Sequence, residues 1–148
     1  MSIALSYDTT LTVRDTCLCL HVQRTARALA RGFDEAFRSL DLTSGQFSLL
    51  VSLNRREAPS IGSVASLLAM DRTTLTAALK PLERRGLVKV SVDDKDRRSR
   101  LLKLAPKGRA LLSRAVPIWE KTHTALEKQL AGADPDRLRS DLHVLSGV

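Results

Sequence analysis

Residues 71–104 hold the side chains of this sequence that best fit a chemical task. A helix that begins after Asp71 would separate an apolar stripe from a polar, basic face, because side chains three and four positions apart share one side of a helix. The stripe is Leu75, Ala78, Leu79 and Leu82, and the other face carries Arg72, Thr73, Thr76 and Lys80. Hydroxyl, methyl and cationic groups of this kind contact base edges and phosphates in DNA. Taken alone, the same face fits a solvated helix surface equally well.

The flanking residues favour a binding surface. Asp71 is a good N-cap, because its carboxylate can accept amide hydrogens of the first turn. Gly86 can end the helix in a left-handed conformation, and residues 87–90 and 100–104 are expected to form two strands around a charged tip. Pro81 lies within the helix and lacks an amide hydrogen, so we expect a kink there; the alternative is a helix that ends one residue earlier.

This order of helix, glycine and hairpin resembles the winged helix-turn-helix of the MarR family of bacterial transcription regulators. The resemblance is carried by residues 71–76 (DRTTLT), 82–88 (LERRGLV), 94–98 (DKDRR) and 104–108 (LAPKG). These segments occur in the expected order and spacing, and the similarity covers nearly the whole chain. It implies a mainly α fold with a small two-stranded β wing: a winged helix-turn-helix with long N- and C-terminal dimerisation helices.

The resemblance also implies which side chains meet double-stranded DNA. The expected DNA-binding residues are Arg72, Thr73, Thr74, Thr76, Lys80, Arg84, Lys95, Arg97, Arg98 and Arg100. The helix residues would enter the major groove, whereas Arg84, Arg85, Lys95 and Arg100 are better placed for phosphates. Many family members carry an arginine where this chain has Ala77, so base preference cannot be transferred. A two-fold homodimer should bind a pseudo-palindromic operator with half-sites about one helical turn apart.

The charged residues of the wing are expected to have different roles. In this family the wing aspartate, here Asp96, pairs with the arginine two residues later, here Arg98, and braces the hairpin. That pairing leaves Arg97 as the group expected in the minor groove, where a narrow groove concentrates negative potential.

Length and periodicity predict one domain over residues 1–148. Residues 14–40 and 106–148 are expected to be dimerisation helices around a winged core at 43–104, and the first thirteen residues an extended or poorly ordered arm. Some 27 helical residues would span about 40 Å, more than a compact core needs, so the surplus should pack on another surface. A Thr43–Gln46 capping box should open the helix after the first, with a bend expected at Pro117 of the long helix that follows the wing.

Charge and composition limit the classes of molecule that this protein is expected to bind. The formal net charge is +8 at pH 7, with a pI of about 10.2, and most of the excess falls between residues 71 and 109. A polyanion is therefore the expected partner, although charge alone does not separate nucleic acid from a membrane. The sequence contains no apolar run of the roughly 18 residues that a span requires and no signal-peptide pattern. We expect a cytoplasmic protein without membrane contact.

Cys19 is the candidate residue for redox regulation. Its position matches the reactive cysteine of the organic-hydroperoxide-sensing branch of the family, but that branch supplies tyrosine hydroxyls where this chain has Phe33 and Ser44. A buried, inert cysteine is the main alternative. A metal site formed by Cys17, Cys19 and His21 is disfavoured. Cys17 and Cys19 lie two apart, and on a helix their side chains would point about 200° from each other, so they could not bind one ion. Cys17 with His21 would leave a site two ligands short.

The commoner family mechanism is release from DNA by a small aromatic or phenolic ligand, bound between the dimerisation helices and the DNA-binding core. Residues placed to line such a crevice are Gln23, Arg27, Phe33, Phe47, Trp119 and His123. Each of them fits an ordinary core or surface position as well.

Two other classes of function compete with a sequence-specific regulator. The three histidines fit no catalytic or metal motif and no glycine-rich phosphate loop is present, so we expect no enzyme, cofactor or metal. A winged helix for non-specific architectural DNA binding or for protein interaction fits the charge nearly as well as a specific regulator does. The discriminating quantity is the specificity ratio at fixed salt. Our prediction is a ligand-released, sequence-specific repressor, with Cys19-based redox sensing as the alternative mechanism.

Overall fold

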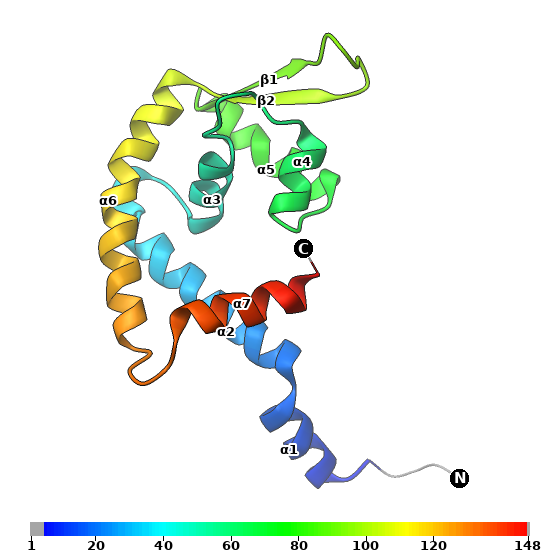
Figure 1. Cartoon of the computed structure of the whole chain (residues 1–148), viewed down its shortest axis with the longest axis vertical. Helices are drawn as coiled ribbons and strands as arrows, with labels where there is room; N and C mark the ends of the chain where they lie inside the picture. The colour runs from blue at the N-terminus through cyan, green and yellow to red at the C-terminus, as the bar shows by residue number, and fades with distance from the viewer. Residues whose placement is uncertain (1–4, 148) are drawn as a thin grey trace.

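The computed structural model describes residues 5–147, and seven α-helices, one 3-10 turn and one two-stranded sheet follow each other within that range (Figure 1). The elements are α1 Tyr7–Thr16, α2 Leu18–Ala36, η1 Arg38–Leu40, α3 Ser44–Ser52, α4 Ile61–Leu67, α5 Arg72–Arg84, β1 Val88–Val92, β2 Arg100–Leu104, α6 Pro106–Lys128 and α7 Pro135–Ser146. This confirms the predicted mainly helical fold with a two-stranded wing. No helix in the described range is long and apolar enough to cross a membrane.

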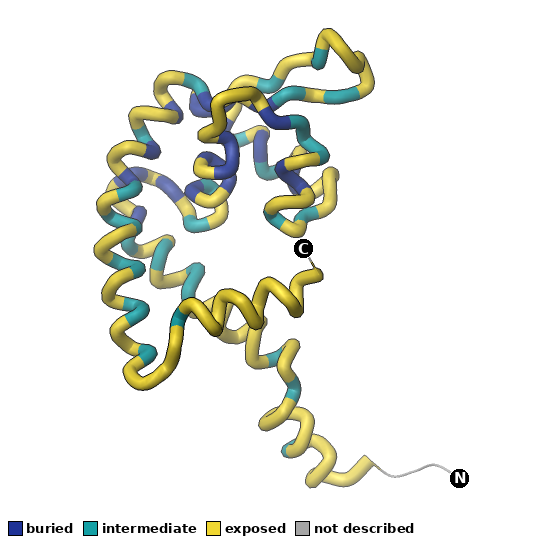
Figure 2. The backbone as a smooth tube through the Cα atoms, in the orientation of Figure 1, coloured by how far each residue is buried: buried dark blue, intermediate teal, exposed yellow. Residues whose placement is uncertain are grey.

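The core lies in the winged half of the molecule. Figure 2 shows the buried residues concentrated around α3, α4, α5 and the sheet, whereas α1 and α7 are exposed along their length. Leu75, Leu79 and Leu82 form the buried stripe of α5 predicted from their spacing, and Leu75 and Leu82 have no accessible surface. Burying this stripe fixes which face of α5 remains outside.

The N-terminal region departs from the prediction. An arm was expected over residues 1–13, but α1 begins at Tyr7, capped by the Ser6 hydroxyl, which accepts a hydrogen bond from the Thr9 amide. Residues 1–4 lie outside the described range. The expected continuous helix over 14–40 is also wrong, because the chain is extended at Cys17 (φ −68°, ψ 109°). Apolar residues recur on both sides of this interruption, so periodicity did not reveal it.

The helix–wing segment closely follows the prediction. The Asp71 carboxylate caps α5, the helix continues through Pro81 to Arg84, and Gly86 adopts a positive φ of 70°. The alternative helix that ends before Pro81 is therefore wrong. β1 begins one residue later and ends two residues later than predicted, and it pairs antiparallel with β2, with Val88 opposite Leu104 and Val92 opposite Arg100.

The long helix α6 joins the two halves of the molecule. It contacts α2 and α3, so it runs along the side of the winged core and continues beyond it (Figure 1). Its start is fixed by Gly108, where an added Cβ would lie 2.1 Å from the Leu87 carbonyl oxygen. The helix ends at Lys128, so the predicted helical region over 106–148 is divided into α6 and α7. Asp134 then caps α7, which makes no extensive contact with another described element.

The predicted capping box is present at the start of α3. The Thr43 hydroxyl accepts from the Gln46 amide, and the Gln46 side chain accepts from the Thr43 amide, both at 3.1 Å. These reciprocal bonds satisfy two donors that a helix start would otherwise leave unpaired.

Candidate nucleic-acid interface

The N-terminus of α5 is set by the turn that joins it to α4. Ala69 takes a positive φ of 51° in this turn, and Asp71 then accepts from the Thr74 amide at 2.7 Å and from the Thr74 hydroxyl at 2.8 Å. These hydrogen bonds hold the pKa of the Asp71 carboxyl below its ordinary value. The hydroxyl hydrogen of Thr74 is therefore committed to the cap, which leaves this predicted DNA-binding residue only as an acceptor.

The outer face of α5 presents the other predicted residues. Arg72, Thr73, Thr76 and Lys80 are exposed, and so is Arg84 in the last turn. Among residues 5–147, the side chains of these five make no hydrogen bond or ion pair. A helix face with free hydroxyl and cationic donors next to a wing has the form of a helix-turn-helix reading surface.

The wing is braced differently from the prediction. The Asp96 carboxylate accepts from the backbone amide of Arg98 at 3.0 Å, and the two side chains form no ion pair in the described structure. The guanidinium that braces the tip belongs to Arg100, whose Nη1 donates to the carbonyls of Arg97 at 3.2 Å and Ser99 at 3.3 Å. An aspartate followed by a turn favours its own backbone amides, because they are closer than a flexible side chain.

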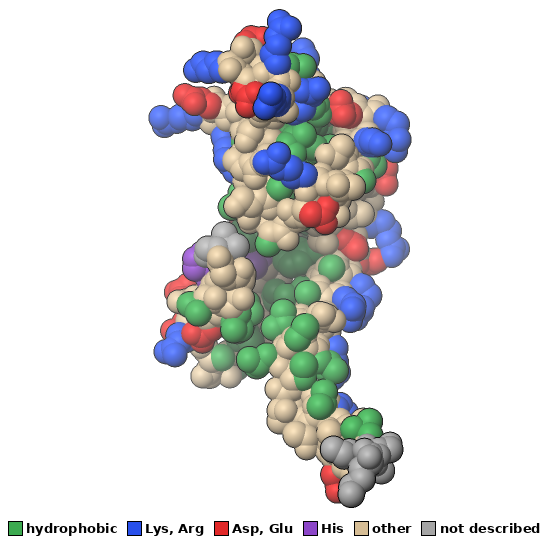
Figure 3. Space-filling model, turned by 90° about the vertical axis from the view of Figure 1, so that its right-hand side faces the viewer, with side chains coloured by type: hydrophobic (Ala, Val, Ile, Leu, Met, Phe, Trp, Pro, Cys, Tyr) green, Lys and Arg blue, Asp and Glu red, His purple; other side chains and the backbone are tan. Residues whose placement is uncertain are grey.

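The wing tip therefore leaves three predicted cations projecting into solvent. Lys95, Arg97 and Arg98 are exposed, and their side chains have no partner between residues 5 and 147. Figure 3 shows Lys and Arg side chains gathered at the winged end of the molecule and hydrophobic side chains over the opposite half. The positive potential is thus greatest beside α5 and the wing.

Arg85, predicted to contact phosphate, has a structural role instead. Its Nη1 donates to the Asp41 carbonyl at 2.7 Å and its Nη2 to the Leu40 carbonyl at 3.4 Å. It therefore ties the end of α5 to the turn before α3. The residues next to Arg85 in the sequence do not predict this contact, because its partners lie 44 and 45 residues away.

The predicted effector residues do not surround one cavity. Four of them belong to an aromatic row, in which Phe33 stacks on Phe37, Phe37 on Phe47, Phe47 on Trp119 and Trp119 on His123, with ring centroids 4.7–6.5 Å apart. Gln23 instead donates to the Cys19 sulfur, and Arg27 lines a separate shallow depression on α2.

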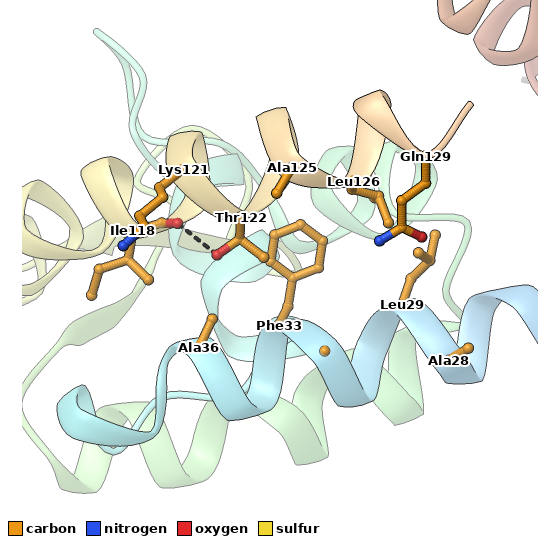
Figure 4. A pocket seen from close by; sticks show the side chains of 11 residues that line it. Ala28, Leu29, Phe33, Ala36, Ile118, Lys121, Thr122, Ala125, Leu126 and Gln129 are labelled. Atoms are coloured by element: carbon orange, nitrogen blue, oxygen red, sulfur yellow. Dashed lines mark hydrogen bonds between the residues drawn. The ribbon is translucent and has the colours of Figure 1, made fainter. Parts of the chain in front are cut away.

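Two apolar pockets are lined in part by members of the aromatic row. One of about 720 Å³ opens between α2 and α6, and Figure 4 shows the Phe33 ring between the two helices, with Lys121 and Gln129 at the rim. A second of about 400 Å³ lies between α3, the end of α4 and α6, and includes Phe47 and Trp119. Sequence patterns did not indicate the part of α6 that lines the larger pocket, because these side chains carry no distinctive chemistry: Ile118, Lys121, Thr122, Ala125 and Leu126.

Cys19 is exposed in the described chain, which contradicts the alternative of a buried cysteine for the single subunit. The Gln23 amide donates to its sulfur at 3.3 Å. Cys17 is half-buried in the extended link between α1 and α2, so Cys17 and Cys19 do not share one helix and the angle of about 200° expected between their side chains does not apply. The described residues contain no group of three or more metal-ligating side chains.

Comparisons with known proteins agree with this architecture. The sequence model of the MarR family matches residues 42–99. The organic hydroperoxide resistance transcriptional regulator of Bacillus subtilis is 30% identical over 128 residues, which are 86% of this chain and 86% of that protein.

Solved structures show the same similarity. The transcriptional regulator MosR of M. tuberculosis, in complex with DNA, superimposes with a TM-score of 0.79 and 34% identity, covering 88% of this chain and 94% of that one. Bordetella bronchiseptica BpsR, whose DNA binding is regulated by 6-hydroxynicotinic acid, gives a TM-score of 0.71 and 28% identity over 88% and 91% of the two chains. With its winged core, its exposed α5 face and these relatives, the chain belongs to the MarR family of DNA-binding transcriptional regulators.

Proposed function

We propose that this protein is a homodimeric, sequence-specific repressor that holds α5 in the major groove of a pseudo-palindromic operator. The observation that carries the proposal is the set of unpaired donors on the outer face of α5, at Arg72, Thr73, Thr76 and Lys80. Lys95, Arg97 and Arg98 at the wing tip would extend the contact to the neighbouring minor groove, and Arg84 to phosphate. The relative MosR, crystallised with DNA, supports this proposal.

The homodimer follows from apolar side chains that the single chain leaves exposed. They lie on α2 and α7: Leu18, Val22, Leu138, Leu142 and Leu145, each more than 40% exposed. Contiguous apolar surface of this kind marks an interaction site, and the family forms dimers through these helices. The regulator would act in the cytoplasm, without a catalytic activity, cofactor or metal of its own.

The first experiment measures binding of the purified protein to the DNA that flanks its own coding region. Dissociation constants for this DNA and for unrelated duplexes are compared at two salt concentrations. A specific regulator retains a ratio of roughly 10³ or more at physiological salt, whereas binding by counterion release alone weakens steeply and equally for all duplexes. Equal affinity for every duplex would favour the architectural alternative and overturn the proposal.

We infer that the effector is a small aromatic molecule bound beside the aromatic row. Phe47 and Trp119 line the smaller apolar pocket, which lies where the winged core meets α6, so its occupation would change the spacing of the two α5 helices in a dimer. The regulation of the relative BpsR by 6-hydroxynicotinic acid supports this chemical class. A screen of aromatic carboxylates for loss of operator binding tests it, with Trp119→Leu as the variant expected to lose the response.

A second candidate mechanism is thiol-based release from DNA. The exposed Cys19 sulfur beside the Gln23 amide favours it, as does the relative that regulates organic hydroperoxide resistance. If it operates, an organic hydroperoxide abolishes operator binding by the wild type and a thiol restores it, whereas Cys19→Ser remains bound. Binding that is indifferent to the oxidant would leave the ligand mechanism alone.

A further inference from the structure

Gly62, in the first turn of α4, lies directly beneath the guanidinium of Arg72. A Cβ atom on Gly62 would lie 2.9 Å from Nη2, 3.5 Å from Cζ and 3.8 Å from Nε of Arg72. Since three atoms of the guanidinium lie so close to this point, the group occupies the space beside α4 where any other residue would place its side chain. The first arginine of α5 therefore extends back over the preceding helix.

The backbone itself does not require glycine at this position. The glycines with positive φ in the described chain are Gly86, Gly132 and Gly147, so Gly62 has a conformation that any residue adopts. Glycine within a helix also lowers helix stability relative to alanine. Contact with Arg72 is thus the constraint that the structure offers for a glycine here.

In this position the N–H groups of the Arg72 guanidinium remain available to donate hydrogen bonds to a ligand. Hydrogen bonds at the start of α5 join Asp71 and Thr74, and Arg72 makes no hydrogen bond or ion pair with residues 5–147. Arginine has many rotamers in water, and the observed rotamer is one that only a residue without a side chain at position 62 leaves room for. A cation with a fixed direction and free donors is suited to bidentate contact with a base edge or a phosphate.

We propose that Gly62 is a positioning residue for operator recognition, which directs Arg72 by giving its guanidinium a place on α4. The inference rests on the proposed function, in which α5 enters the major groove. A methyl group at position 62 would displace the end of a flexible side chain and not the backbone. The substitution should therefore redirect Arg72 while leaving α4 and α5 folded.

The test compares Gly62→Ala, Arg72→Ala and the double variant. The probe is the duplex that the wild-type protein selects from a random-sequence pool, together with single-base-pair variants of each half-site position, at one salt concentration. Arg72→Ala should reduce discrimination about tenfold at one position. Gly62→Ala should reduce or change the preference at that same position by about threefold to tenfold. In the Arg72→Ala background Gly62→Ala should have no further effect.

A matched control is available in α3. Gly45→Ala also replaces a helical glycine, but its Cβ would meet nothing within 4 Å, so base preference should be unchanged. The unfolding temperature of Gly62→Ala should not fall, since alanine is the better helix former. If Gly62 had a purely structural role, Gly62→Ala would unfold at a lower temperature. Any change in its base preference would then fall at operator positions unrelated to the one affected by Arg72→Ala.

Several results would overturn the inference. One is an unaltered base preference in Gly62→Ala; another is an equal effect of this substitution with and without Arg72. If the wild type discriminates but Arg72→Ala is silent, Gly62 has no arginine contact to direct and the inference fails while the proposed function stands. If the wild type selects no sequence at all, the proposed function itself fails.

Discussion

At the scale of single residues, two glycines near the DNA-binding surface have opposite consequences. A Cβ on Gly62 meets the end of a flexible side chain, whereas a Cβ on Gly108 would lie 2.1 Å from the Leu87 carbonyl oxygen and 2.9 Å from Leu104 Cδ1. The same carbonyl accepts a hydrogen bond from the Ala105 amide at 2.9 Å, so it cannot turn away without losing that bond. α6 would have to move instead.

Gly108→Ala should therefore destabilise the fold. We expect a loss of about 1–3 kcal/mol in the free energy of unfolding, which is typical of an added carbon in a filled space. Urea denaturation measures it, and Gly45→Ala is the control because its Cβ has open space. A change within about 0.5 kcal/mol would mean that α6 has more freedom at its start than the structure indicates.

The Asp71 cap gives α5 a predictable dependence on pH. Hydrogen bonds from Thr74 lower the pKa of the Asp71 carboxyl below its ordinary value, so the folded state favours the ionised form. The stabilisation is fully present above the pKa of the unfolded chain and is lost as pH falls through the lower folded pKa. Asp71→Ala should lower the unfolding temperature by a few degrees near neutral pH, and this difference should shrink below about pH 4.

Asp71→Asn separates capping from titration. Asparagine is also a good N-cap but does not ionise in this range. The unfolding temperature of Asp71→Asn near neutral pH should lie close to that of the wild type. The part of the acid-induced fall in unfolding temperature that comes from titration of residue 71 should disappear. An Asp71→Ala variant as stable as the wild type at pH 7 would show that the cap contributes nothing.

At the scale of elements, the wing contains one arginine that is bonded to the backbone and one whose guanidinium is free in the described structure. The Arg100 guanidinium is engaged with the carbonyls of Arg97 and Ser99, whereas the Arg97 side chain is exposed and has no partner among residues 5–147. Arg97→Ala should weaken binding to most sequences by about tenfold at ~0.15 M salt and reduce the salt slope by about one. Binding titrations at several salt concentrations give both quantities.

Arg100 is the comparison within the same wing. Arg100→Lys keeps the charge but loses the fork that reaches two carbonyls, so its effect should come from a less ordered tip, visible as faster amide exchange at residues 97–99. Unchanged DNA affinity in Arg97→Ala would mean that this arginine does not contact DNA, and the wing assignment would be wrong.

At the scale of the whole molecule, the dimer should depend on one stripe of α7. Leu138, Leu142 and Leu145 recur at helical spacing and are 44%, 41% and 62% exposed. Leu142→Glu places a charge in this stripe, so it should raise the dimer dissociation constant at least tenfold, since a buried leucine contributes about 1.5–3 kcal/mol. Sedimentation velocity over a concentration series measures this constant, and operator affinity should fall with dimer formation.

Val144→Glu is the matched control for the dimer stripe. Val144 is 75% exposed and lies two positions after Leu142, on a different side of the same helix. The Val144→Glu substitution should therefore leave the dimer dissociation constant unchanged. If both variants dissociate equally, the stripe is not the interface; if neither does, α7 is not part of it.

Elements that depend on local chemistry were predictable from the amino-acid sequence. The Asp71 cap, the Thr43–Gln46 capping box, the Gly86 helix end and the bounds of β2 all agree with the structure. Each depends on a few neighbouring residues, whose hydrogen bonds and allowed dihedral angles are the same in any fold. The predicted apolar stripe of α5 is correct for the same reason.

Contacts between side chains distant in sequence were not predictable in the same way. Arg85 looked like a phosphate ligand until its guanidinium was found on the carbonyls of Leu40 and Asp41. The proximity of the Arg72 guanidinium to Gly62 likewise arises where α4 packs against α5. Such contacts depend on the relative placement of whole helices, which is set by the combined packing of the core and is not encoded at either contacting residue.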